Sequence, residues 1–147
     1  MVKAQRKPIE EIKDAINGYQ NVLITGCGGC VSVCLAGGQR EVNELKAQLN
    51  IHLQKDKIQK DLDGYTVERQ CNDEFLEELE PKVGQYDCVL SMACGAGVQN
   101  MAKRFPDIPV FPALDTVSIG IDNDIVMYES LFRSFCHCVL FYPAFFF

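Results

Sequence analysis

Three of the eight cysteines fall within one short, glycine-rich stretch of the chain. The stretch reads Gly26-Cys27-Gly28-Gly29-Cys30-Val31-Ser32-Val33-Cys34, with the spacing C-x-x-C-x-x-x-C. Thiolates are ligands that zinc and iron–sulfur clusters prefer, and a C-x-x-C pair supplies two of them from one turn. The stretch therefore predicts a metal-binding loop.

The elements that would position these cysteines alternate between short apolar runs and helical patterns. We expect strands over residues 21–25, 65–69, 86–92 and 108–111, with a turn at Gly64. Helices are expected over residues 8–17, from 31 with an interruption near 37–38, over 40–57, after 72 and from 98 to about 105. The alternation predicts an α/β fold, a mainly parallel four-stranded sheet flanked by helices in a Rossmann/flavodoxin-like three-layer architecture.

The chain is expected to divide into one domain and a tail. Residues 1–130 form a single α/β cysteine-cluster domain, which begins with a lead-in helix. Residues 131–147 form a hydrophobic tail, in which Cys136-His137-Cys138 is a second possible metal-binding fragment, weak by itself. The prolines at 109 and 112 place the fourth predicted strand at a sheet edge.

Cysteines from distant parts of the sequence follow the predicted strands. Cys27, Cys71 and Cys94 each come at or shortly after the carboxyl end of one. In parallel α/β sheets these ends share an edge, where ligands bind. We therefore expect Cys27, Cys30, Cys71 and Cys94 to be metal ligands. Cys34 lies one helical turn after Cys30 and could replace one of them or lie behind the site.

Glycines flank several of these cysteines. Gly26, Gly28, Gly29 and Gly95 are expected to shape the loops around the bound group, because glycine allows tight turns and close backbone approach. The loops also lead into helix amino ends, whose partial positive charge favours anionic groups. Cys88 lies inside a predicted strand, where a free cysteine most often fills the core.

Composition excludes several classes of function. The net charge is −6 without a basic block, so nucleic acid and an anionic membrane are not expected partners. The charged amino-terminal segment lacks the apolar core of a signal peptide, which favours a cytoplasmic protein. Only two histidines occur, which gives poor support for a cysteine–histidine nucleophile pair.

Three kinds of protein fit four such thiols. The first is an electron-transfer or accessory subunit with a [4Fe–4S] cluster and no complete active site of its own. The second is a zinc-stabilised interaction module. The third is a thiol–disulfide enzyme that uses Cys27 and Cys30, ranked last because it leaves Cys71 and Cys94 without a role.

The cysteine motifs, taken in order, resemble those of the methylenetetrahydrofolate reductase C-terminal-domain family, the MetV-type small subunit. The resemblance covers about residues 8–140 and is carried by residues 22–31 with Cys34 and 36–38, by 68–71 and by 94–99. It implies an iron–sulfur protein that binds the flavin-containing methylenetetrahydrofolate reductase subunit and passes electrons to or from the flavin in one-carbon metabolism. By the motif match, the cluster ligands are Cys27, Cys30, Cys71 and Cys94, with Cys34 as fifth candidate.

The chain departs from the family pattern near its end. The family continues after the region of Cys136 and Cys138 into a longer cysteine- and glycine-rich tail, whereas this chain ends in Phe145-Phe146-Phe147. The tail is thus shortened or altered relative to the family. A second metal site or a partner contact supplied by the family tail is not implied here.

Overall fold

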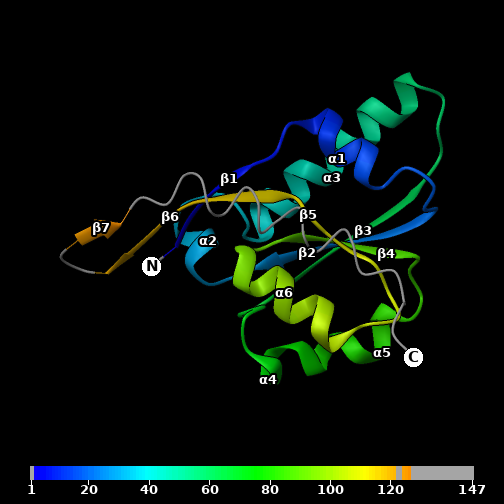
Figure 1. Ribbon diagram of the computed structural model, residues 1–147. Coiled ribbons are helices and arrows are strands. Elements are labelled where there is room, and N and C mark those ends of the chain that lie inside the picture. The colour runs from blue at the N-terminus through cyan, green and yellow to red at the C-terminus, as the bar shows by residue number, and fades with distance from the viewer. Residues whose placement is uncertain (1, 122–123, 127–147) are drawn as a thin grey trace, which may run out of the picture.

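The computed structural model describes residues 2–121 and 124–126 (Figure 1). Its elements, in chain order, are β1 (Val2–Arg6), α1 (Ile9–Ala15), β2 (Asn21–Cys27), α2 (Cys30–Val33), α3 (Gln39–Lys55), β3 (Asp61–Val67), α4 (Asp73–Leu76), the 3-10 turn η1 (Glu77–Leu79), α5 (Glu80–Val83), β4 (Cys88–Met92), α6 (Gly95–Arg104), β5 (Val110–Pro112), β6 (Leu114–Ile121) and β7 (Asp124–Val126).

The centre of the structure is a parallel sheet of four strands in the order β3-β2-β4-β5. Helix α3 covers one face and α6 the other, with α4 and α5 beside it (Figure 1). The predicted α/β class and four-stranded parallel sheet flanked by helices are confirmed. The last of these strands, β5, lies at the sheet edge, as its prolines predict.

Alternating side chains of the central strand reach the two faces of this sheet. Val42 of α3 packs where side chains at Gly26 and Gly64 would lie, which places those glycines on the α3 face. Thr25 and its partner Ser91 in β4 therefore face the α6 side. Both are fully buried, so both faces of β2 are covered.

The predicted turn at Gly64 is wrong, because Gly64 lies within β3 opposite Ile24. A side-chain carbon at Gly64 would come 2.8 Å from Cγ1 of Val42. The glycine thus makes room for α3 to approach the sheet, and does not reverse the chain. As a result β3 begins four residues earlier than the predicted strand at 65.

A second, antiparallel sheet in the order β1-β6-β7 was not predicted. Strand β1 pairs with β6 from Val2, opposite Ile119, to Arg6, opposite Leu114. This pairing joins segments more than a hundred residues apart, and only Ala4 of β1 is buried, so local periodicity gives little sign of it. The sheet brings the start of the chain beside α2.

The core lies on both sides of the parallel sheet. The predicted apolar stripe of the long helix is buried, through Val42, Leu45, Leu49 and Leu53 of α3. Burying each such side chain contributes about 1.5–3 kcal/mol. Within residues 2–121 and 124–126, every helix is too short or too polar to traverse a lipid bilayer.

Substitution of Gly37 tests how closely the α2–α3 connection packs against the sheet. A side-chain carbon there would come 2.1 Å from the Met92 carbonyl oxygen, and the Gly37 carbonyl already accepts a hydrogen bond from the Cys27 N–H at 2.8 Å. We expect Gly37→Ala to lower the free energy of unfolding in urea by about 2–3 kcal/mol through overpacking.

Gly84→Ala is the matched control for that measurement. Apart from the residue itself and its chain neighbours, no atom lies within 4 Å of the added carbon, and the residue has ordinary right-handed helical torsions. The variant should match the wild type or gain up to about 1 kcal/mol. Equal losses in the two variants would contradict the packing described at Gly37.

Candidate functional site

The carboxyl ends of three neighbouring strands meet at one edge of the parallel sheet. In the register, Cys27 at the end of β2 lies opposite Val67 at the end of β3, and Gly26 lies opposite Met92 at the end of β4. The turns that follow these strands carry the remaining candidate ligands. We call this edge, with the loops that carry Cys27, Cys30, Cys71 and Cys94, the cysteine edge.

The four thiols of the cysteine edge differ in exposure. Cys27 is buried, with 6% of its surface exposed, whereas Cys30 at the start of α2 and Cys71 are exposed. Cys94 is half-buried at the amino end of α6. Among the described residues, no three or more cysteine, histidine, aspartate or glutamate side chains are grouped so that they could hold a metal ion. The fold therefore gathers the loops without closing the thiols into a coordination shell.

Cys34 lies on the β1 side of α2. Its thiol contacts the carbonyl oxygens of Val31 at 3.4 Å and Ala4 at 3.8 Å. It also lines a cavity of about 410 Å³, together with Lys3, Ala4, Gln5, Arg6, Leu35, Ala36, Glu41 and Glu44. None of the other candidate cysteines lines this cavity, and its thiol has local acceptors, so Cys34 is placed less favourably than Cys30.

A buried glutamine joins the loops of the cysteine edge. The Gln70 side chain has no exposed surface. Its Nε2 donates to the carbonyl oxygens of Thr25 and Gly26, both at 2.9 Å, and its Oε1 accepts from the Ser91 hydroxyl at 2.6 Å. The Asn100 side chain of α6 donates to the Gln70 carbonyl oxygen at 3.1 Å. One residue thus links β2, β4 and α6 to the turn that carries Cys71.

The sequence prediction missed this role of Gln70. The residue entered only as part of the motif at 68–71. One sequence feature could have indicated it. Gln70 is a polar amide that directly precedes the candidate ligand Cys71 and follows a buried strand, and burial of an unpaired amide there would lower stability.

Glycines bring the first cysteine loop against the turn after β3. A side-chain carbon at Gly28 would lie 3.4 Å from the Glu68 carbonyl oxygen. One at Gly29 would lie 3.5 Å from Cγ of Arg69 and 3.6 Å from the Cys27 sulfur. The loop that carries Cys27 and Cys30 therefore packs closely on the segment that leads to Cys71.

Gly26 and Gly95 differ in the space around them. A side chain at Gly26 would collide with Thr66, Val42 and the Gly37 carbonyl oxygen, at 2.4–2.9 Å. At Gly95 the nearest atom would be the Thr116 hydroxyl oxygen at 3.9 Å, and that oxygen accepts a hydrogen bond from the Gly95 N–H. Gly26 is required by packing, whereas a side chain at Gly95 would fit.

Cys88 is a core residue, as its position in a strand predicts. It is fully buried in β4. Burial, with a smaller effect from the neighbouring Asp87 carboxylate, raises the pKa of the Cys88 thiol to about 12. It therefore stays protonated at neutral pH and does not belong to the cysteine edge.

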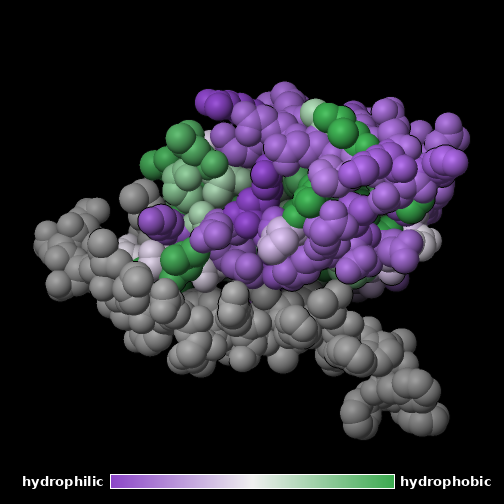
Figure 2. All heavy atoms as spheres, turned by 90° about the horizontal axis from the view of Figure 1, so that it is seen from above, coloured by the Kyte–Doolittle hydropathy of each residue, from purple (hydrophilic) through white to green (hydrophobic). Residues whose placement is uncertain are grey.

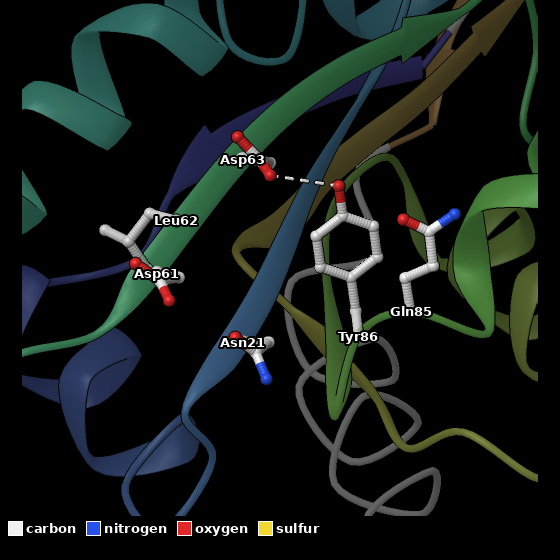
Figure 3. A pocket seen from close by; sticks show the side chains of 6 residues that line it. All are labelled: Asn21, Asp61, Leu62, Asp63, Gln85 and Tyr86. Carbon is white, nitrogen blue, oxygen red and sulfur yellow. Dashed lines mark hydrogen bonds between the residues drawn. The ribbon is translucent and has the colours of Figure 1, made fainter.

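A second hollow lies at the opposite, amino-terminal end of the strands (Figure 3). It has a volume of about 320 Å³ and is lined by Asn21, Asp61, Leu62, Asp63, Gln85 and Tyr86. The Asp63 carboxylate accepts a hydrogen bond from the Tyr86 hydroxyl at 3.0 Å and pairs with Lys46 at 3.4 Å. This carboxylate is therefore already engaged within the protein, and we place the candidate site at the cysteine edge.

The predicted second metal fragment at Cys136 and Cys138, and the tail over 131–147, lie outside the described residues.

Alkylation of the folded protein tests this division of the cysteines. In the metal-free protein at pH 8, iodoacetamide should modify Cys30 and Cys71 rapidly, because both thiols are exposed and can be reached. Cys88 should react only after unfolding in urea, because its thiol is buried and protonated. Peptide mass spectrometry measures each site, and comparable rates at Cys88 and Cys30 in folded protein would contradict the assignment.

No family model, curated protein or solved structure matches the chain in comparisons with known proteins. The resemblance to the methylenetetrahydrofolate reductase C-terminal-domain family therefore rests on the sequence motifs alone.

Proposed function

We propose that the cysteine edge holds a [4Fe–4S] cluster, and that the chain is a non-catalytic accessory subunit of a methylenetetrahydrofolate reductase complex. The observation that carries this proposal is the meeting of β2, β3 and β4 at one edge, with a candidate ligand in the loop after each strand. Four soft sulfur donors suit such a cluster.

The order of the parallel strands supports a flavodoxin-like architecture for this sheet. Counted in chain order, β2, β3, β4 and β5 are arranged second-first-third-fourth. The flavodoxin-like order begins in the same way. In that fold, ligands bind beside the first strand, at the point where the strand order reverses direction. Here that point lies between β2 and β4, whose ends lead to Cys27 and Cys94.

The donor residues fit a bound cluster in chemistry and accessibility. Cys27 would be the fixed ligand, because it is buried at the end of a paired strand. Cys30 and Cys71 would complete the set from exposed positions, with Cys94 as the fourth ligand and Cys34 as the less favourable substitute. A bound cluster would supply one-electron transfer.

The protein environment would act on such a cluster through its charges. Arg69 adds a positively charged side chain two residues before Cys71, and its Cγ lies beside Gly29 of the C-x-x-C loop. The first turn of α6 contains no acidic residue, so the positive end of its dipole is not offset there. Both features favour retention of an anionic cluster.

The surface beside Cys30 suits contact with a partner protein. Val33 and Leu35 are 68% and 71% exposed, in α2 and directly after it. The face over α1 and α3 is mainly hydrophilic, with hydrophobic side chains gathered toward the end that carries α2 (Figure 2). Exposed apolar groups of this kind often mark interfaces. In this proposal the partner is the flavin-containing reductase subunit, which provides the active site.

Metal content of protein purified without oxygen tests the proposal. We expect about four irons and four sulfides per chain. Cys27→Ser, Cys71→Ser and Cys94→Ser should each lower both contents sharply, because each removes a thiolate ligand. Iron and acid-labile sulfide are measured on the folded fraction.

Cys88→Ala is the control for this series, because it removes a buried thiol that is not part of the cysteine edge. It should retain the iron and sulfide of the wild type. Stoichiometric zinc without sulfide would replace the proposal with the zinc-stabilised interaction module. Absence of bound metal in the wild type would refute both.

A further inference from the structure

The hydrogen bonds of Gln70 are complete although the side chain is fully buried. Both Nε2 hydrogens have an acceptor and Oε1 has a donor, so the amide carries no unpaired polar group. Satisfied buried networks hold their members in one arrangement, because any shift would leave a polar group unpaired in a low-dielectric interior. The Gln70 contacts therefore restrict the segments that they join.

These contacts fall next to the candidate ligands. Gln70 directly precedes Cys71, and its acceptor Gly26 directly precedes Cys27. Its donor Ser91 lies three residues before Cys94. The network thus fixes the backbone at the base of three separate cysteine loops, while Cys30 and Cys71 remain exposed at their ends.

Helix α6 is packed directly on this glutamine. A side-chain carbon at Gly97 would lie 3.0 Å from Cβ of Gln70 and 2.7 Å from Cβ of Ala93. Together with the hydrogen bond from Asn100, this contact fixes α6 against the turn before Cys71. The loop that carries Cys94 is therefore held by Gln70, as are the loops that carry Cys27 and Cys71.

We infer that Gln70 is the positioning residue of the metal centre: it holds the bases of the loops with Cys27, Cys71 and Cys94 in fixed relative places. This inference rests on the proposed function. Because the loop bases are preset, less of the chain has to become ordered when metal binds, which lowers the cost of assembling the site. Mutation of a residue that orients metal ligands typically lowers metal affinity 10–100-fold.

The first test compares Gln70→Met with the control Leu79→Val. Methionine keeps the approximate volume and removes every side-chain hydrogen bond. Leu79 is fully buried in η1, outside the cysteine loops, so its truncation lowers stability without touching the network. Urea unfolding measures the stability of both variants, and Co²⁺ titration of the reduced, metal-free chains measures thiolate binding through its charge-transfer absorbance.

We expect Gln70→Met to weaken Co²⁺ binding about 10–100-fold, with little change in Leu79→Val. Asn100→Ala, which removes one contact of the same network, should have an intermediate effect. Equal Co²⁺ affinity in Gln70→Met and Leu79→Val would overturn the inference, because Gln70 would then act only through stability.

A second readout needs no metal, and separates failure of this inference from failure of the proposed function. Iodoacetamide alkylation of the reduced, metal-free chains, followed by peptide mass spectrometry, measures how firmly the loop bases are held. Alkylation of the buried Cys27 should be slow in the wild type and in Leu79→Val, and about tenfold faster in Gln70→Met. That result supports the positioning role even if the wild type binds neither Co²⁺ nor iron. Equal rates of Cys27 alkylation in Gln70→Met and Leu79→Val would overturn it.

Discussion

The parallel register of β2 between β3 and β4 is the constraint on which the candidate site depends. It forces three chain segments to leave the sheet at the same edge, with Cys27 opposite Val67 and Gly26 opposite Met92. The strand pairing ends at this edge. Here Nε2 of the buried Gln70 side chain donates hydrogen bonds to the Thr25 and Gly26 carbonyl oxygens. This link acts beside the backbone hydrogen bonds from the Cys27 N–H to the Gly37 carbonyl and from the Gly28 N–H to the Val67 carbonyl.

The cysteine edge combines a fixed part with an accessible part. Cys27 is buried in the end of a paired strand, whereas Cys30 and Cys71 are exposed. In the proposed account, binding of the cluster would draw the accessible ligands together, so that part of the binding free energy would order the loops.

Local sequence patterns predicted the parallel sheet, the edge position of β5 and the meeting of the cysteine loops at one edge. These features depend on short-range apolar periodicity, proline positions and strand direction. They did not give the β1-β6-β7 sheet, since its pairing joins distant segments. The predicted turn at Gly64 is wrong because the sequence alone does not distinguish a glycine that makes room for a packed helix from one that reverses the chain. The role of Gln70 also escaped prediction, because its partners are backbone carbonyl groups and Ser91, far away in sequence.

X-ray absorption spectroscopy at the iron and zinc edges, on protein purified without oxygen, tests the central claim most directly. The proposed cluster predicts an iron spectrum with sulfur neighbours and an additional iron–iron scattering path, both of which disappear in Cys27→Ser. A zinc spectrum with sulfur neighbours at about 2.3 Å and no bound iron would contradict the claim and show a structural zinc site. No metal signal from folded protein would contradict every metal-based account of the cysteine edge.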